Sequence, residues 1–226
     1  MHELEKNILY IFAFVPVSPG ALLPWVITAC IGFGCWYATK ELTSYEPGPA
    51  QNFVEFVYEN LEIFVKMIVG EKLTKKLLPV LSTIFIYIFS ANIMGIVPGL
   101  KSPTSLFSNC LGMALVVFFL TAYYGFKNHG FIGYLKHFTG PVWWMAPLMF
   151  PIHIIGEISR PISLTLRLFG NIMGEDVVIL VLTSIIFPLL VPLPMLFLAL
   201  FTSLLQALVF TILSGVYLSG AISEGH

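Results

Sequence analysis

The amino-acid sequence predicts an all-α integral membrane protein, with about five membrane-embedded helices and one amphipathic helix on the membrane surface. Of its 226 residues, 58% are hydrophobic and 10% are charged. The mean hydropathy is +0.91, which leaves too little polar surface to cover a water-soluble globule. Several windows of the sequence contain no charged residue. A membrane helix needs roughly 20 predominantly apolar residues to cross about 30 Å of hydrocarbon. The windows are residues 7–39, 77–100, 102–126, 138–156 and 177–223.

Three of these windows predict one membrane span each, within a single membrane domain over residues 1–226. Pro16, Pro19 and Pro24 interrupt the first window, so its helix is expected only from residue 22 onward. The second and third windows have the length of one crossing. The expected spans are residues 22–39, 77–99 and 105–126.

Residues 51–76 predict a helix of different character. Charged residues recur there at spacings of three and four, and apolar residues occupy the complementary positions. This pattern is typical of a helix on a membrane surface. The alternative, a charged face of a helix packed on a soluble domain, has little support because no soluble domain remains. The charged positions are Glu55, Glu59, Glu62 and Lys66, and the apolar ones include Phe53, Val57, Leu61, Phe64, Val65 and Ile68.

The last window is too long for one perpendicular crossing. Pro188, Pro192 and Pro194 remove backbone donors within it, and proline breaks or kinks a helix where it falls. Two arrangements stay open: a short helix that turns at the prolines into a second one, or a steeply tilted hairpin. We expect the arms of this hairpin to be residues 141–174 and 176–219.

The lysines predict the orientation of the chain. If the first three spans alternate in direction, seven lysines fall on one side and two on the other. Lys-rich loops stay in the cytoplasm, so the N-terminus is expected outside and the C-terminus in the cytoplasm. The seven are Lys40, Lys66, Lys72, Lys75, Lys76, Lys127 and Lys136, and the two are Lys6 and Lys101.

Arg167 is the leading candidate functional residue. An arginine keeps its proton at any physiological pH, so within a bilayer it needs a water-filled cavity or an anionic partner. On a helical wheel the polar residues between 153 and 175 share its face, whereas Asp176 points nearly opposite. Such runs of titratable groups mark proton or ion pathways, although His153 alone fits an interhelical hydrogen bond better. The shared face comprises His153, Glu157, Arg160, Ser163, Arg167, Asn171 and Glu175.

A weaker polar stripe follows on the last helix, where Gln206 fits helix packing and a function equally well. The stripe comprises Thr202, Ser203, Gln206 and Ser214. Motifs for other chemistries are absent from the sequence, which has no HExxH pair, no phosphate-binding GxxxxGK[ST] loop and no Cys/His spacing for a metal. We therefore expect no cofactor and no metal. The net charge of −1 and the scattered basic residues also argue against nucleic acid as a partner.

The sequence RPISLTLRLFGN, residues 160–171, resembles the signature of subunit a of bacterial F-type ATP synthase. The resemblance continues in Gly174-Glu175-Asp176 and in residues 206–210, QALVF. It covers most of the chain from Glu46 onward. Further matching stretches are residues 51–55, 92–99 and 147–152.

This resemblance implies a proton-translocating stator subunit of the membrane Fo sector, an ion channel rather than an enzyme. In the family, the arginine matching Arg167 faces a carboxylate on each passing helix of the c-subunit ring, and two offset half-channels carry the proton. Asn171, Asp176 and Gln206 match positions that line the outer half-channel, with Glu175 beside them. His153 matches a site on the proton path that is often acidic or His in relatives, and Glu157 adds a carboxylate one turn further along. Arg160 and Ser163 would support this path. Where some relatives carry a titratable group, this chain has Ala199.

The resemblance also implies the setting: a multi-pass protein of the bacterial inner membrane, in contact with the lipid bilayer, the c-ring and the b subunits of the peripheral stalk. One rival hypothesis is a stand-alone transporter that binds an anionic substrate at Arg167, but no internal duplication supports it. Another is a structural anchor, which leaves Arg167 without a well-placed acidic partner within the chain.

Overall fold

The computed structural model describes residues 19–40, 48–96, 102–139, 146–185 and 192–223. These residues form six α-helices and one short 3₁₀ turn, so the predicted all-α class is confirmed. The elements are α2 (Pro19–Ala38), α3 (Pro49–Val69), α4 (Glu71–Met94), η1 (Pro103–Ser105), α5 (Phe107–Thr139), α6 (Ala146–Ile185) and α7 (Pro192–Ser223).

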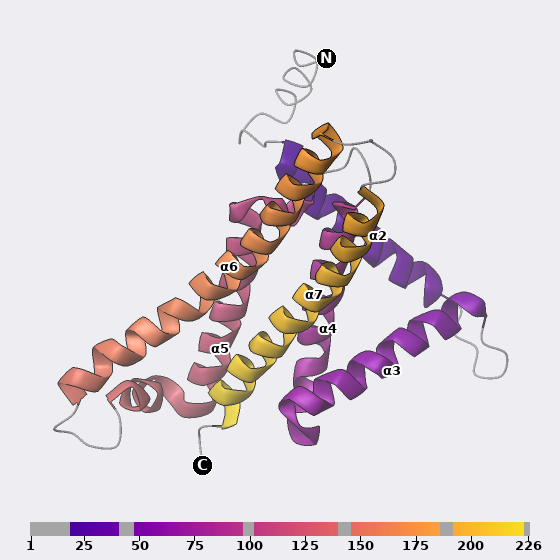
Figure 1. Ribbon diagram of the computed structural model, residues 1–226. Helices are drawn as coiled ribbons and strands as arrows, with labels where there is room; N and C mark the ends of the chain where they lie inside the picture. Colours follow the sequence, from indigo (N-terminus) through magenta and orange to yellow (C-terminus); the bar gives the residue numbers. More distant parts are fainter. Residues whose placement is uncertain (1–18, 41–47, 97–101, 140–145, 186–191, 224–226) are drawn as a thin grey trace, which may run out of the picture.

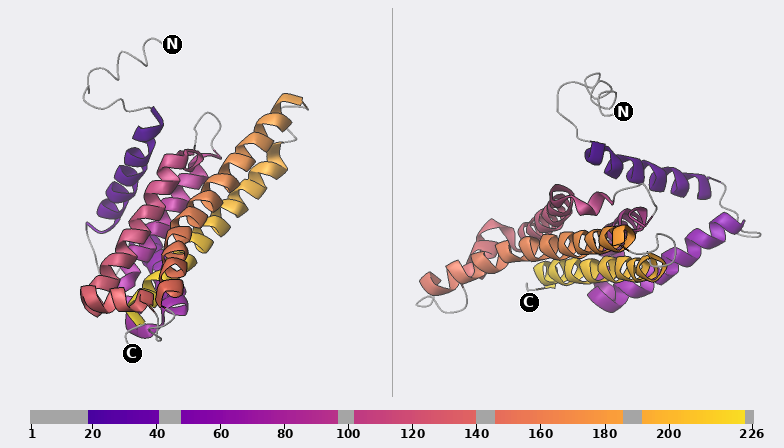
Figure 2. Two further views of the ribbon diagram at one scale, coloured as in Figure 1. Left: turned by 90° about the vertical axis from the view of Figure 1, so that its left-hand side faces the viewer. Right: turned by 45° about the horizontal axis from the view of Figure 1, so that its top comes forward.

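Among the described residues, three segments are long and apolar enough to cross a membrane: Glu71–Met94, Phe107–Asn128 and Pro194–Ile222. A shorter apolar helix covers Leu23–Tyr37 within α2. Figure 1 shows α4, α5, α6 and α7 gathered into a bundle, from which α3 projects to the side. In the two further views of Figure 2, α6 and α7 again run alongside each other.

The helix expected over residues 51–76 is divided in the structure. Gly70 separates α3 from α4 with a φ of +77°, a left-handed conformation that L-residues rarely adopt. Its N–H donates to the Lys66 carbonyl, and the Lys66 ammonium bonds Glu71 across the turn at 2.6 Å. Residues 71–76 therefore begin the membrane-spanning α4 instead of ending the surface helix.

The expected break near residue 175 is also absent, because α6 continues through Gly174 to Ile185. The described part of α6 ends at Ile185, and the next described residue is Pro192, the first residue of α7. Proline suits the first position of a helix because the N–H it lacks would be unpaired there. The 40 residues of α6 correspond to roughly 60 Å of helix, about twice the hydrocarbon thickness. A helix of this length favours the tilted arrangement over a short helix and a turn.

Two clusters of buried side chains hold the helices together. One lies where α4, α5, α6 and α7 meet and includes Ile88, Cys110, Leu168 and Phe210. The other joins α3, α4 and the end of α7 through Val65, Leu77, Leu81 and Leu218. Together they fix α6 and α7, the helices that carry both polar stripes.

Candidate functional site

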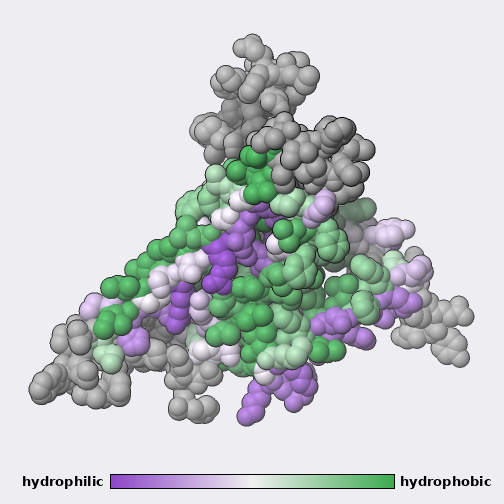
Figure 3. Space-filling model, viewed as in Figure 1, coloured by the Kyte–Doolittle hydropathy of each residue, from purple (hydrophilic) through white to green (hydrophobic). Residues whose placement is uncertain are grey.

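Arg167 lies at the surface of α6, with its neighbours facing the bundle. Leu164, Leu168 and Ile172 follow one another at spacings of four and are at most 4% exposed. Arg167 is exposed beside this buried stripe, and it forms no hydrogen bond or ion pair with any residue that the structure describes. Figure 3 shows a hydrophilic band that follows the course of α6 across a largely hydrophobic surface. The guanidinium is therefore unpaired within the described part of the chain.

Asn171, one turn beyond the arginine, connects α6 to α7. Its Nδ2 donates to Oε1 of Gln206 at 2.8 Å. Gln206 is 4% exposed, and its Nε2 is buried without a hydrogen-bond partner among the described residues. The polar stripes of α6 and α7 thus meet at the hydrogen bond between Asn171 and Gln206. The Gln206 Nε2 beside it is a donor without a partner among the described residues.

Glu175 and Asp176 line a recess between α6, α7 and the end of α4. Oε2 of Glu175 accepts a hydrogen bond from Thr202 Oγ1 at 2.9 Å. Both carboxylates are half-buried, although the helical wheel placed Asp176 nearly opposite the stripe. The recess has about 260 Å³ of space, part of it open to the surroundings. It is lined by Asn92, Gly95, Ile96, Ser102, Ile172, Glu175, Asp176, Ala199 and Ser203.

Asn92 is a candidate residue that sequence reasoning missed. Its Oδ1 accepts a hydrogen bond from Thr104 Oγ1 at 2.7 Å, and its Nδ2 is buried without a partner among the described residues. It is 2% exposed and lines the recess with Glu175. One signal was available: Asn92 is the only amide side chain in the charge-free window 77–100.

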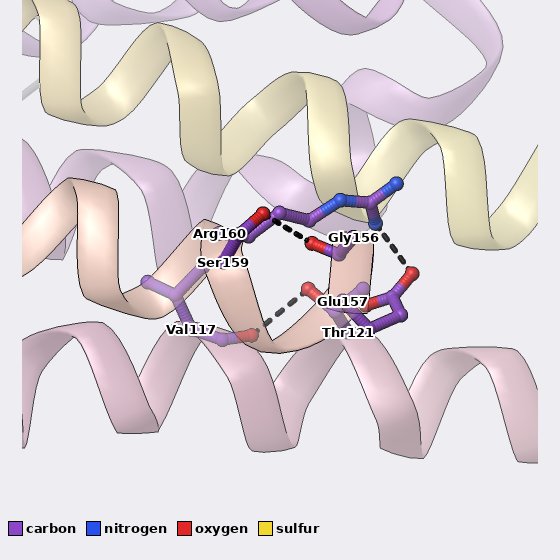
Figure 4. A network of polar contacts seen from close by, with 6 residues as sticks. All are labelled: Val117, Thr121, Gly156, Glu157, Ser159 and Arg160. Carbon is purple, nitrogen blue, oxygen red and sulfur yellow. Dashed lines mark hydrogen bonds and ion pairs between the residues drawn. The ribbon is translucent and has the colours of Figure 1, made fainter. Parts of the chain in front are cut away.

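A second recess, bordered by an ion pair, lies toward the other end of α6. Arg160 Nη1 pairs with Glu157 Oε1 at 2.7 Å, and the guanidinium lies over the Tyr217 ring of α7, 4.9 Å from its centroid. Figure 4 shows this ion pair beside Thr121 of α5, whose hydroxyl bonds the Val117 carbonyl. The recess is lined by Ala114, Val117, Phe118, Thr121, Glu157, Arg160, Pro161, Leu164 and Tyr217.

The remaining predicted residues also lie on α6. His153 is half-buried one turn before Glu157, and Ser163 is exposed between the two arginines. The structure thus arranges the predicted side chains in two polar regions, with Arg167 between them. Glu157 and Glu175 are 18 positions apart, roughly 27 Å along the helix, which is close to the thickness of the hydrocarbon layer.

This arrangement suits the transfer of a small ion in two stages. Both recesses offer hydroxyl and carboxylate groups that can bind water or a proton, and the recess of Glu175 also offers the amide of Asn92. The fixed cation between them repels a proton attempting to pass directly. An acidic group from outside could reach Arg167 and exchange its proton with either recess.

Comparisons with known proteins agree with the resemblance. Residues 21–219 match the family described as ATP synthase A chain. The chain is 41% identical over 202 residues to "ATP synthase subunit a" of Geobacter sulfurreducens, covering 89% of this chain and 86% of that protein. It is 46% identical over 186 residues to the protein of the same name in Helicobacter hepaticus, covering 82% and 81%. For Helicobacter pylori the identity is 41% over 203 residues, covering 89% of each chain.

Proposed function

The chain belongs to the ATP synthase A chain family, and from this premise we propose the path by which it carries protons past Arg167. As subunit a, it is the proton-conducting stator of the Fo sector, a multi-pass membrane protein of bacterial ATP synthase. It conducts ions and leaves the chemistry of ATP to other subunits.

The outer half-channel runs through the recess that contains Glu175 and Asp176. Asn171 and Gln206 connect it to Arg167, because their side chains bond each other one turn from the arginine. Ala199 lines the same recess and cannot carry a proton. Glu175 is then the relay group, since the Thr202 hydroxyl bonds its carboxylate across the gap between α6 and α7.

The inner half-channel passes His153 and Glu157 on the other side of Arg167. Ser163 adds an exposed hydroxyl between this region and the arginine. Arg160 supports the path from its place beside Glu157. The two half-channels are offset along α6, so a proton reaches one from the other only on a carrier that passes Arg167.

That carrier is a carboxylate on each helix of the rotating c-ring. A permanent cation within about 4 to 6 Å favours the deprotonated form of a carboxylate, so the ring acid releases its proton as it approaches Arg167 and takes one up after leaving. The observation that supports this most strongly is the exposed arginine without a partner in the part of the chain that the structure describes. Proton flow and rotation are thereby coupled.

The proposed assembly has three further features. The polar face of α6 and α7 contacts the c-ring, the b subunits of the peripheral stalk contact the chain elsewhere, and the rest of its surface meets lipid. The exposed apolar side chains Phe53, Phe56, Ile63 and Met67 of α3 are suited to that lipid contact. The N-terminus is outside and the C-terminus in the cytoplasm of the bacterial inner membrane.

ATP-driven proton pumping by membrane vesicles carrying Arg167→Ala tests the proposal. We expect pumping to be lost while the complex still assembles. Arg167→Lys should recover little activity, because an ammonium in an apolar setting can lose its proton and a guanidinium does not. Lys75→Ala removes an exposed cation outside the polar face and serves as the matched control. Intact pumping in Arg167→Ala with altered uptake of an anionic solute would favour the transporter instead.

A further inference from the structure

A second guanidinium lies in the proposed inner half-channel and needs an explanation. Arg160 is seven residues before Arg167, which is two helical turns or roughly 10 Å along α6. A free cation there would repel protons entering the path and attract the ring carboxylate away from Arg167. The side chains around it include Val117, Phe118 and Leu164, and such apolar surroundings extend the reach of a charge.

The contacts of the two arginines differ sharply. Arg160 pairs with Glu157 at 2.7 Å and covers the ring of Tyr217, as Figure 4 shows for the ion pair. The exposed fractions are 40% for the Arg160 side chain and 22% for Glu157, so the pair is partly shielded from water. Arg167 has no such partner among the described residues. On this face of α6, the Arg160 cation is compensated by the carboxylate of Glu157. The Arg167 cation is available to the carboxylate of the c-ring.

We infer that Glu157 is a positioning residue that neutralises Arg160, so that the inner recess carries no net charge and Arg167 alone attracts the ring carboxylate. The inference rests on the proposed function and defines the part of Glu157 in it more closely. Arg160 contributes in turn through its contact with Tyr217, because a guanidinium over an aromatic face joins α6 to α7. Because Glu157 neutralises the Arg160 charge, the contact between Arg160 and Tyr217 can join the helices without repelling protons.

Passive proton conduction through Fo in vesicles freed of the F1 sector tests the inference. Glu157→Gln leaves Arg160 uncompensated, and we expect conduction to fall on the order of tenfold. The double variant Glu157→Gln/Arg160→Gln has no net charge in the recess and should regain at least half of the parent rate. If removing the Arg160 charge restores conduction to Glu157→Gln, the carboxylate serves to compensate the arginine. If Glu157 carried the proton itself, removing Arg160 would not restore conduction. The amounts of subunits a, b and c in the vesicles report assembly.

Glu71→Gln provides a matched control. It also removes the carboxylate of an ion pair, the 2.6 Å bond to Lys66, but this pair is exposed and lies outside the polar face of α6. We expect its conduction to equal that of the parent. If the loss of any ion pair impaired the complex, conduction would fall equally in Glu157→Gln and Glu71→Gln, and this result would contradict the inference.

Further outcomes would overturn it. If the double variant conducts as poorly as Glu157→Gln, the carboxylate carries the proton itself; if Glu157→Gln conducts normally, no compensation is needed. If only the double variant assembles, the pair serves assembly instead of conduction. Should neither neutral variant assemble, Glu157→Asp keeps the anion and must conduct at more than half the parent rate. Failure of the proposed function would appear separately, as normal pumping by Arg167→Ala.

Discussion

Two hydrogen bonds beyond Arg167 on α6 show how single residues prepare the site. Asn171 donates its amide N–H to Gln206 Oε1, so this amide oxygen is already bonded and does not substitute for an anion at the arginine. Thr202 likewise occupies Glu175, the nearest carboxylate beyond the asparagine. Intramolecular partners are thus given to the groups that could compete for the guanidinium, which leaves its charge available.

Asn92 offers the sharpest test of the outer path at this scale. Its buried Nδ2 lines the recess beside Glu175 without a partner among the described residues, and a buried donor of this kind is usually satisfied by water. Asn92→Leu would remove the donor and dry the recess. We expect passive proton conduction through Fo to fall about tenfold, equivalent to a barrier higher by about 1.4 kcal/mol.

Asn109→Leu is the control for this substitution. The Asn109 side-chain amide donates to the carbonyl of Pro103 in η1 at 2.9 Å. Asn109 does not line the recess. Equal losses in both variants would mean that η1 had moved and that Asn92 has no part in conduction.

The residues of the site were predictable to different degrees from the sequence. Arg167 and its stripe follow from helical periodicity, because all members lie on one helix. Asn92 and Tyr217 approach the site from α4 and α7, and no local pattern reports a contact between distant segments. The amide pair of Asn171 and Gln206 spans 35 positions and also needed the fold.

At the scale of elements, composition predicted the number of helices better than their ends. Polar residues continue across Gly70, so the sequence pattern did not separate α3 from α4. The boundary expected at residue 175 was also wrong, because α6 continues from Ala146 to Ile185. Pro192 was the stronger signal, because α7 begins there and a proline lacks the N–H that a helix interior requires.

The packing of α7 against the α3–α4 turn predicts a steric effect at Gly215. A Cβ added there would lie 2.7 Å from Cγ2 of Ile68 and 3.3 Å from Cδ1 of Leu81. Overpacking costs about 1–3 kcal/mol, which exceeds the gain of about 0.8–1.0 kcal/mol in helix propensity from glycine to alanine. We expect Gly215→Ala to lower the melting temperature of the purified complex.

Two further variants identify the cause of this loss. Adding Ile68→Ala to Gly215→Ala should restore part of the stability, because it removes the clashing methyl group. Gly112→Ala, on α5, has nothing within 4 Å of its added Cβ and should be neutral or slightly stabilising. A Gly215→Ala complex as stable as the parent would show that α7 does not approach α3 so closely.

At the scale of the whole molecule, the charges lie unevenly between the two ends of the bundle. Lysines gather at the α3–α4 turn and along the second half of α5, and two of them cover tyrosine rings: Lys76 over Tyr124 at 4.7 Å and Lys127 over Tyr123 at 5.7 Å. The hydrogen-bonded carboxylate of Glu71 raises the pKa of Lys66, so this lysine also stays charged. An excess of basic residues is typical of the cytoplasmic membrane face.

This asymmetry predicts which face of the membrane each end of the bundle meets. Lys75, in the first turns of α4, and Ser108, at the start of α5, are both exposed and lie at opposite ends, since α4 leads through η1 into α5. With Cys30, Cys35 and Cys110 replaced by alanine, a membrane-impermeant maleimide should label Lys75→Cys in inverted vesicles and Ser108→Cys in right-side-out vesicles. The opposite pattern would reverse the orientation. The recess of Glu175 would then open to the cytoplasm and the Glu157–Arg160 pair would lie in the outer path, although the division of the two paths by Arg167 would be unchanged.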